Sequence, residues 1–282
     1  MIIGYSKCLE PHICWMELKN DIRIESWSEL CDRVYDNSFQ PSLDRFRANF
    51  AFRGISDKNY NLESRFARTC KGNVHLEYHL LRNFRKYAGD NHQDALNSDW
   101  RTLTIGQHYG LPTRLLDWTY SPFVAIHFAT ADINKFGCDG VIWKVDFVKA
   151  HKVLPSKLKS ILEDVGSNSF TIEMLDEVLP TLKDFDTLAG ETQALFFEPP
   201  SIDSRIVNQF AFFSVMSDPL ATFNHWLNNH PDLFTRIIIP KELKWEIRDK
   251  LDQANITERL LFPGLDGLAK WLERHYTPKT PI

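Results

Sequence analysis

The stretch 107–122, QHYGLPTRLLDWTYSP, decides how this chain is interpreted. It places amide, imidazole, guanidinium, carboxylate and hydroxyl groups together, and apolar residues flank it on both sides. Gly110 and Pro112 should end a helix whose last turn carries a glutamine and a histidine. Ser121 should cap the next helix, with a proline at its first position. Because polar groups in apolar surroundings need partners, the stretch predicts either a buried hydrogen-bonded corner or a ligand cleft.

Two other polar side chains lie beside apolar strands. Arg53 ends the expected strand 49–54, and Gln209 stands where a short helical turn passes into another apolar strand. A buried guanidinium is costly unless it is paired, so Arg53 should form a structural ion pair or bind an anion such as phosphate. Gln209 should either bond to the backbone or serve a site. Gly54 would let backbone or a ligand come close.

The expected helices and strands follow no regular alternation. Strands are expected at 49–54, 140–147, 194–197 and 234–239, with one more after Gln209, and helices at 27–35, 75–88, 99–109, 122–133, 219–229 and 241–254, with a last one after 264. This irregular mixture favours an α+β fold in a single compact mixed domain. We expect a leader at 1–25 that could include one strand, a domain at 26–272 with a helical insertion or lid at 155–190, and a tail at 273–282.

Three finer predictions concern the packing of these elements. The helix 75–88 should turn an apolar stripe inward, made of Leu76, Leu80, Leu81, Phe84 and Tyr87. His127, among apolar residues on the helix after Pro122, is interpreted as a core residue. The stretch 38–48 is expected to be a polar connection.

Composition narrows the class of protein. The 282 residues are 43% hydrophobic and 25% charged, which is ordinary for a globular chain. The net charge of −4 gives no global basic field for nucleic acid, although a local basic cleft remains compatible with it. The five cysteines form no CxxC pair, so free thiols are expected and a zinc site is not. No signal peptide and no apolar run of about 18–20 residues is found, so we expect a cytoplasmic protein without a membrane segment.

Three motifs resemble the FRG domain, a family named for its Phe-Arg-Gly tripeptide. They are Phe52-Arg53-Gly54 with the downstream Leu62 and Arg65, the run QHYGLPTRLLDWT at 107–119, and LFPGLDGL at 261–268. The resemblance spans roughly residues 26 to 272. At Gly264 the chain departs from the acidic residue that is common there, and we interpret that position as structural.

The arrangement also resembles a remote ADP-ribosyltransferase, which implies a split sheet with flanking helices. In that superfamily an arginine on the first strand binds the dinucleotide, which would be Arg53. A Ser or Thr ahead of a helix with an Ala-aromatic pattern lines the nicotinamide pocket, which would be Thr113 or Thr119. A Glu or Gln on a later strand contacts the ribose, which would be Gln209. The chain lacks the family's Ser-Thr-Ser triplet and Glu-x-Glu pair, so Glu191 and Glu198 remain alternatives for the third role.

The resemblance implies that NAD is the substrate and that no metal takes part. The candidate catalytic residues are Arg53, Thr113, Asp117 and Gln209, and the candidate NAD-binding residues are Arg53, Gln107, His108, Tyr109, Arg114 and Thr119. Cleavage of the nicotinamide–ribose bond requires an ordered diphosphate, an aromatic surface for the nicotinamide, and a polar group on the ribose hydroxyl. Tyr109, Trp118 or Tyr120 would supply the aromatic surface.

The implied function is ADP-ribosylation of a macromolecule, either a nucleic acid or a protein, by a bacterial toxin or phage-defence effector. Such a toxin would need an antitoxin or chaperone partner. Two alternatives remain open. One is a metal-free nuclease or phosphotransfer enzyme that uses Gln107, His108, Arg114 and Asp117. The other is a non-catalytic recognition module in which the polar corner is structural.

Overall fold

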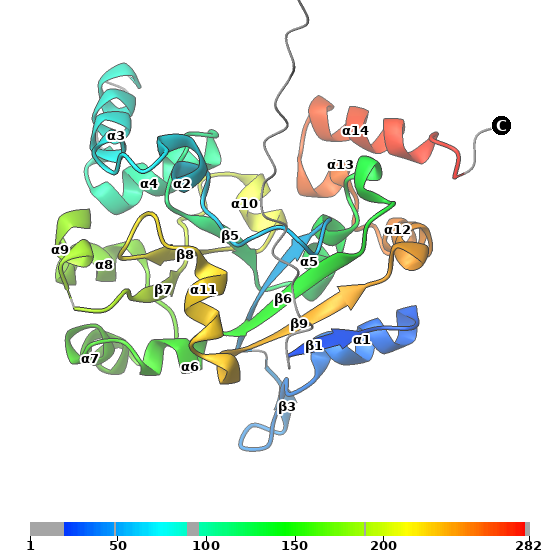
Figure 1. Cartoon of the computed structure of the whole chain (residues 1–282), viewed down its shortest axis with the longest axis horizontal. Helices are drawn as coiled ribbons and strands as arrows, with labels where there is room; N and C mark the ends of the chain where they lie inside the picture. Colours follow the sequence, from blue (N-terminus) through cyan, green and yellow to red (C-terminus); the bar gives the residue numbers. More distant parts are fainter. Residues whose placement is uncertain (1–19, 48, 89–95, 189, 280–282) are drawn as a thin grey trace, which may run out of the picture.

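The computed structural model describes residues 20–47, 49–88, 96–188 and 190–279. These residues form one mixed sheet with flanking helices and a separate two-stranded hairpin (Figure 1). The α+β fold in one compact domain is therefore confirmed. Most of the expected leader, residues 1–19 with Cys8 and Cys14, lies outside the described ranges. The other three cysteines are free thiols.

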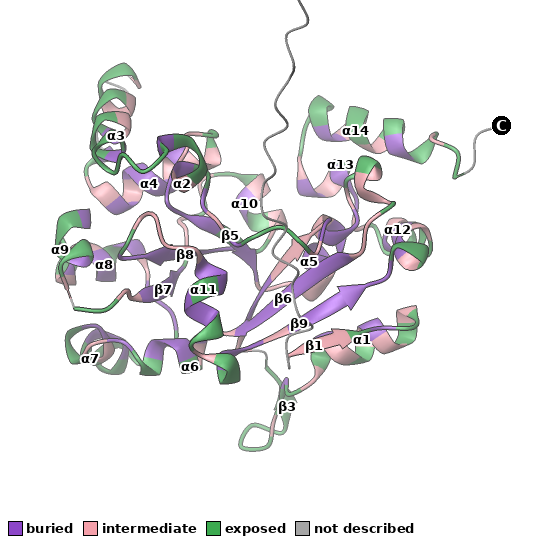
Figure 2. Ribbon diagram, viewed as in Figure 1, coloured by how far each residue is buried: buried purple, intermediate pink, exposed green. Residues whose placement is uncertain are grey.

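The main sheet has seven strands in the order β1-β9-β6-β4-β5-β8-β7. These strands are β1 (Asp21–Arg23), β9 (Phe234–Ile239), β6 (Gly140–Asp146), β4 (Phe50–Ile55), β5 (Leu116–Thr119), β8 (Ala211–Met216) and β7 (Ala194–Phe197). The β1–β9 pair is parallel and the other neighbours are antiparallel. Figure 2 shows that the central strands are buried along most of their length.

The sheet is nearly divided between β4 and β5. The β4–β6 ladder runs the whole length of β4, whereas the register between β4 and β5 joins only Phe52 and Thr119. We call this boundary the seam. The sheet implied by the resemblance was split, and the structure instead has one continuous sheet that narrows to a single residue pair at the seam.

The helices cover both faces of the sheet. They are α1 (Trp27–Tyr35), α2 (Arg65–Cys70), α3 (His75–Tyr87), α4 (Asp99–His108), α5 (Pro122–Ala129), α6 (Phe147–Lys152), α7 (Ser156–Val165), α8 (Ile172–Val178), α9 (Leu182–Asp186), α10 (Ser204–Asn208), α11 (Phe223–Asn228), α12 (Lys244–Gln253), α13 (Glu258–Leu261) and α14 (Leu265–His275), with 3-10 helices η3 (Ile133–Lys135), η4 (Pro231–Leu233) and η5 (Lys241–Leu243). One apolar cluster packs α6 and α11 on the sheet. A second packs α4, α7, α8 and α9 against β7 and β8, and a third packs α1, α5 and α12 against β4, β6 and β9.

Serine caps fix the starts of the helices that border the seam. The side chains of Ser98 and Ser121 accept backbone N–H bonds from the third residue after them, as their sequence positions predict. Helix α5 ends at Ala129, earlier than expected, because Thr130 leaves the helical conformation and bonds back to the last turn.

Helix α5 lies directly on the backbone of β4. A Cβ at Gly54 would overlap the carbonyl oxygen of Ala125, so only glycine allows the helix to come this close. The close approach that the sequence indicated at Gly54 is therefore one between two backbones. His127 on the same helix is fully buried, as expected of a core residue, and its Nδ1 lies 2.8 Å from Nη1 of Arg248.

Several expected details are wrong. The stretch 38–48 is not only a polar connection, because it forms the hairpin β2 (Phe39–Gln40) and β3 (Arg45–Phe46). The segment 155–190 belongs to the core, because α7, α8 and α9 supply much of the second apolar cluster. The domain boundary expected at residue 272 falls inside α14.

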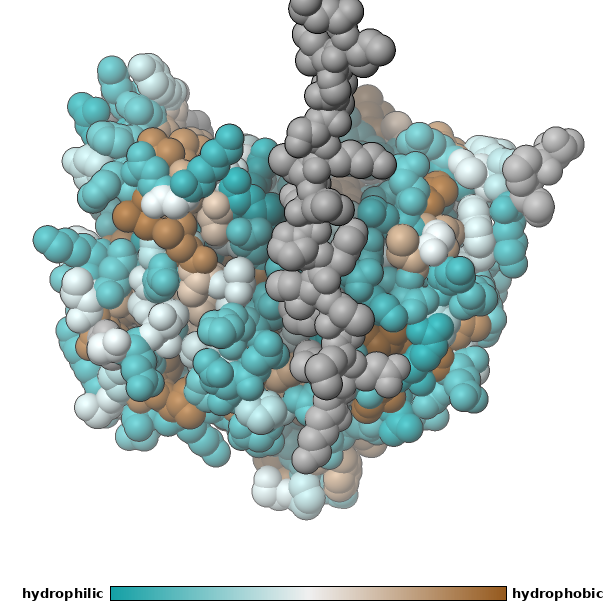
Figure 3. Space-filling model, viewed as in Figure 1, coloured by the Kyte–Doolittle hydropathy of each residue, from teal (hydrophilic) through white to brown (hydrophobic). Residues whose placement is uncertain are grey.

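Helix α3 has a different buried face from the one predicted. Glu77 and Leu81 are its buried residues, while Leu76 and Tyr87 are exposed. Together with α2 and Leu111, the outward apolar face of α3 forms a surface groove. Figure 3 shows apolar surface in this part of the molecule.

Candidate functional site

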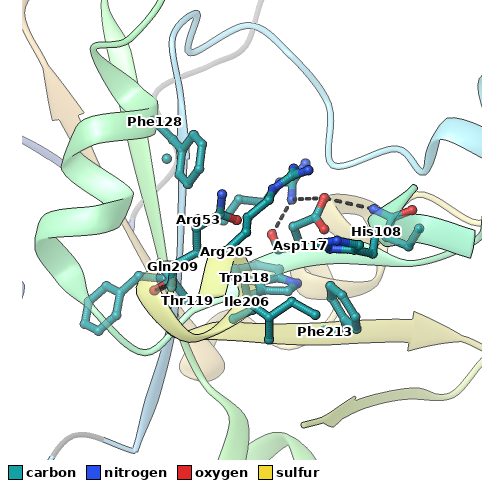
Figure 4. A pocket seen from close by; sticks show the side chains of 14 residues that line it. Arg53, His108, Asp117, Trp118, Thr119, Phe128, Arg205, Ile206, Gln209 and Phe213 are labelled. Atoms are coloured by element: carbon teal, nitrogen blue, oxygen red, sulfur yellow. Dashed lines mark hydrogen bonds and ion pairs between the residues drawn. The ribbon is translucent and has the colours of Figure 1, made fainter. Parts of the chain in front are cut away.

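A cavity of about 200 Å³ lies at the seam. Its walls come from β4, α4, β5, α5, α10 and β8 (Figure 4), through Phe52, Arg53, Gly54, Gln107, His108, Asp117, Trp118, Thr119, Phe128, Arg205, Ile206, Gln209, Ala211 and Phe213. Six of the nine different residues proposed from the sequence are in this set: Arg53, Gln107, His108, Asp117, Thr119 and Gln209. We call this cavity the seam cavity.

Arg53 connects the two halves of the sheet across the seam. Its Nη1 donates a hydrogen bond to the backbone carbonyl of Asp117 and lies 4.0 Å from the Oδ2 of the same residue. Its Nε is buried and has no hydrogen-bond partner within the described ranges. Burial lowers the pKa of the guanidinium, and the charge of Asp117 opposes this shift. Arg53 is therefore only partly satisfied by the protein, which suits a group that binds an anion.

Gln107 joins Asp117 to the buried base of the QHYGLPTRLLDWT motif. Its Nε2 donates to Oδ2 of Asp117 at 2.9 Å, and its Oε1 accepts from Oγ1 of Thr113 at 2.6 Å. Thr113 is fully buried and does not line the cavity. Its place is beneath Gln107, where it orients the amide.

His108 contacts the carboxylate of the residue that caps α10. Its Nε2 lies 2.8 Å from Oδ2 of Asp203, and the carboxylate of Asp203 also accepts the backbone N–H groups of Arg205 and Ile206. The pair links the end of α4 to the start of α10. It therefore fixes the helical turn that carries Arg205 and Gln209.

Thr119 and Gln209 are joined on the other side of the cavity. The Thr119 hydroxyl donates to the backbone carbonyl of Gln209 at 2.7 Å and accepts from the N–H of Ser121. The side-chain Nε2 of Gln209 donates to the carbonyl of Leu261 at 2.9 Å, which fixes the amide plane. In the part of the chain that the structure describes, nothing donates to its Oε1. Phe210, the next residue, has a φ of +50°, an uncommon conformation that often accompanies functional sites.

The third motif holds α10 from behind. Asn208 Nδ2 donates to the carbonyl of Leu260, beside the bond from Gln209 to Leu261. The ring of Phe262 lies 5.1 Å from the guanidinium carbon of Arg205 and makes an edge-to-face contact with Phe128. The hairpin α13–α14 thus positions two walls of the seam cavity.

Three of the residues proposed from the sequence lie away from the seam cavity. Thr113 is buried beneath it, and Tyr109 is 70% exposed. Arg114 forms a buried ion-pair cluster with Glu77 and Asp186, and these carboxylates raise its pKa. Arg114 thus belongs to a buried hydrogen-bonded corner, which was one of the two interpretations that the motif allowed.

Of the aromatic residues and acids proposed as alternatives, only Trp118 lines the seam cavity, and its ring packs in the core. The ring of Trp118 packs on Phe196 and Phe223 in the core, and its Nε1 bonds to Ser214. Tyr120 stacks on Phe212 and donates to Glu198. Neither Glu191 nor Glu198 lines the seam cavity.

Two lining residues that were not proposed from the sequence add an aromatic ring and a positive charge to the cavity. Phe128 faces the cavity from α5, and the Ala-aromatic pattern of that helix was the signal that pointed to it. Arg205 precedes Gln209 by four residues, and this spacing places both on the same face of a helical turn. Figure 4 shows Arg53 and Arg205 side by side, with Phe128 on one side and Asp117 on the other.

A second cavity of about 280 Å³ adjoins the first. The two share the side chains of Arg53, Gln107, His108, Asp117 and Arg205, and the second adds Arg65 and Arg68 among its walls. We call it the arginine cavity. A ligand that enters the seam cavity therefore has an adjoining cavity with positively charged walls.

The described residues include neither a candidate metal site nor a candidate membrane-spanning helix. No group of three or more His, Cys, Asp or Glu side chains there could hold a metal ion. No helix within the same ranges has the length and apolar character needed to cross a membrane.

Comparison with known proteins identifies one domain family. The sequence profile of the FRG domain matches residues 48–138, which contain the Phe-Arg-Gly tripeptide and the QHYGLPTRLLDWT motif. The resemblance seen in the sequence is therefore confirmed for this part of the chain. No curated protein and no solved structure matches the chain.

Proposed function

We propose that this FRG-domain protein is an ADP-ribosyltransferase-like enzyme, which binds NAD in the seam cavity and transfers ADP-ribose to a nucleic acid or protein. The observation that carries the proposal is the meeting of Arg53, Thr119 and Gln209 in one cavity. They come from β4, β5 and the end of α10, and they correspond by position to the three elements implied by the resemblance to that superfamily.

The size and walls of the cavity support this ligand. Ligand pockets typically measure about 300–1,000 Å³. The seam cavity is smaller, at about 200 Å³, so it would take only the nicotinamide–ribose half of the dinucleotide. Phe128 offers an aromatic surface to the nicotinamide ring, in place of the expected Tyr109, Trp118 or Tyr120. The rest of the dinucleotide would extend into the arginine cavity.

The polar groups suit the proposed reaction. The bond between ribose C1′ and the nicotinamide nitrogen breaks, the electron pair leaves with nicotinamide, and positive charge develops on the ribose. The hydrogen bond from Gln209 Nε2 to the carbonyl of Leu261 fixes the amide, so its Oε1 would accept a hydrogen bond from a ribose hydroxyl. The carboxylate of Asp117, 60% exposed and oriented by Gln107, would accept the proton that the attacking group of the acceptor loses.

The direct test is the release of nicotinamide from NAD by the purified protein. Gln209→Ala should lower the rate about 100-fold, as loss of a fixed polar group in a reaction site typically does. Val207→Ala is the matched control, because Val207 lies on the same helix and is 55% exposed. A Gln209→Ala variant that melts like the wild type and releases nicotinamide at the same rate would exclude this site.

One observation favours a second candidate, a metal-free phosphotransfer enzyme or nuclease. His108, whose Nε2 lies 2.8 Å from Asp203, borders a cavity with several arginines and would act as the general acid or base of this candidate. This candidate predicts cleavage of RNA or DNA without NAD, and loss of cleavage in His108→Gln. Nicotinamide release with intact nucleic acid would decide for the transferase.

If the enzyme acts in the cell that makes it, expression should slow growth unless an antitoxin is present. The resemblance implies this toxin or phage-defence role in the cytoplasm. Growth should recover with Gln209→Ala at equal protein level and should stay slow with Val207→Ala. If both folded variants slow growth equally, the growth defect does not depend on the seam cavity.

A further inference from the structure

Three arginines of the arginine cavity have no acidic partner. Within the described ranges, Arg65, Arg68 and Arg205 form no ion pair with a carboxylate. Nη1 of Arg65 donates to the carbonyl of Gly110 at 2.8 Å, and Nη1 of Arg68 donates to the carbonyl of Glu63 at 2.6 Å. Arg205 lies over the ring of Phe262. Each guanidinium is therefore held in place while its charge is left without a counter-charge.

This differs from the structural arginines of the same protein. Arg114 and Arg274 are buried, and each pairs with two carboxylates. A guanidinium has five N–H donors, and the backbone bonds described for Arg65 and Arg68 use one nitrogen of each. The remaining donors are available to a ligand.

The positive charges around the cavity also act on one another. Arg53 lies between the two cavities, and its pKa is lowered first by burial and further by the charge of Arg68, against the effect of Asp117. The acids on this wall are Glu63 and Asp117, fewer than the four arginines. An anion in the cavity would relieve this repulsion.

We propose that Arg65, Arg68 and Arg205 form a binding site for the diphosphate group of a nucleotide at the mouth of the seam cavity. Guanidinium groups bind phosphoryl oxygens through paired N–H donors, which makes arginine the suitable side chain for this ligand. A cavity of about 280 Å³ is large enough for a diphosphate with its ribose. The assignment of that diphosphate to NAD rests on the proposed function.

The Gly110 turn builds this site. Gly110 has a φ of +82°, which favours glycine, and the turn that it forms places its carbonyl against Arg65. The QHYG part of the motif thus serves both cavities, since Gln107 and His108 line the two of them.

The test measures binding of ADP-ribose and of inorganic pyrophosphate by calorimetry. Arg65→Ala and Arg68→Ala should each weaken both ligands about tenfold, because each removes charge-assisted hydrogen bonds. Arg82→Ala removes the same charge from an exposed position on α3 outside both cavities and should change neither affinity. The affinity of the wild type should fall as salt concentration rises.

The outcomes separate this site from the proposed reaction. If ADP-ribose binds through Arg65 and Arg68 but no nicotinamide is released from NAD, the diphosphate site is supported and the proposed transferase activity is wrong. Nicotinamide release with the same KM for NAD in wild type and Arg65→Ala/Arg68→Ala would keep the transferase and overturn the diphosphate site. If single-stranded RNA binds through these arginines while ADP-ribose and pyrophosphate do not, the proposal is wrong and the ligand is nucleic acid.

Discussion

Gly54 connects the Phe-Arg-Gly tripeptide to the wall of the cavity. It follows Arg53 on β4, and its lack of a side chain allows the backbone of α5 to lie on the strand at Ala125. Phe128, one turn further along α5, is thereby brought to the seam cavity beside Arg53. The glycine of the tripeptide therefore determines how far apart two walls of the site lie.

Replacing Gly54 with alanine should destabilise the protein by about 3 kcal/mol, because the new methyl group can be accommodated only if α5 shifts. The free energy of unfolding in urea measures this. Gly137→Ala is the control, since a Cβ there meets no atom within 4 Å and should change stability little. Equal stability of the two variants would mean that α5 does not need this close approach.

Single residues also show where sequence reasoning works and where it stops. Arg53 and Gln209 were found because each is a polar residue beside an apolar strand. Thr113 was offered as an equal of Thr119, yet β5 begins only at Leu116, so Thr113 precedes the strand and faces the interior. Arg114 was unpredictable because its partners are 37 and 72 residues away.

At the scale of elements, the hairpin α13–α14 depends on buried charge. Arg274 bonds to Glu258 and Asp252, and Arg248 pairs with the same two acids while contacting His127 on α5. Burial raises the pKa of Glu258, but the hydrogen bonds from Arg274 and the charge of Arg248 outweigh it and lower this pKa to about 2. This cluster fixes the hairpin, whose Leu261 carbonyl in turn accepts the hydrogen bond from Gln209.

Arg274→Ala should therefore lower the free energy of unfolding by about 3–5 kcal/mol, because it removes the hydrogen bonds and one of the two counter-charges of the buried carboxylates of Asp252 and Glu258. Any residual folded enzyme should also have a lower kcat, since the hairpin no longer fixes the Gln209 amide. Glu273→Ala, on the exposed side of the same helix, provides the comparison. A stable Arg274→Ala variant would show that the cluster is not needed to anchor the hairpin.

Element boundaries and element faces differed in how well they could be predicted. The starts of α1, α4 and α5 follow from serine caps, which act locally. The buried face of α3 could not be predicted from its own apolar stripe. Glu77 turns inward because the buried Arg114 requires a counter-charge, and this rotation leaves Leu76 at the surface.

For the whole molecule, the buried His151 contributes to the response to acid. Burial lowers the pKa of His151 from 6.5 to about 4, and its two ring nitrogens lie at hydrogen-bond distance from the backbone of Asn168 and Phe196. Because the unfolded chain takes up this proton near pH 6.5 and the folded one near pH 4, stability falls between these values as pH decreases. The contribution is about 1.4 kcal/mol per pH unit.

A His151→Gln variant should therefore show a flatter dependence of unfolding free energy on pH between 6.5 and 4 than the wild type does. Urea unfolding at several pH values measures the slope. His275→Gln, at an exposed position of α14, should keep the wild-type slope. Identical slopes for His151→Gln and the wild type would mean that His151 does not stay neutral in the folded protein.

The near-division of the sheet has a consequence for its motions. With β4 and β5 joined in register only at Phe52 and Thr119, few backbone hydrogen bonds resist separation of the two halves there. Amide protons of β5 that point toward β4, away from its complete ladder with β8, should consequently exchange with deuterium sooner than those in the middle of β6, which has a ladder on both sides. A molecule seated between β4 and β5 would slow that exchange, and the protection pattern would report its arrival even before any product forms.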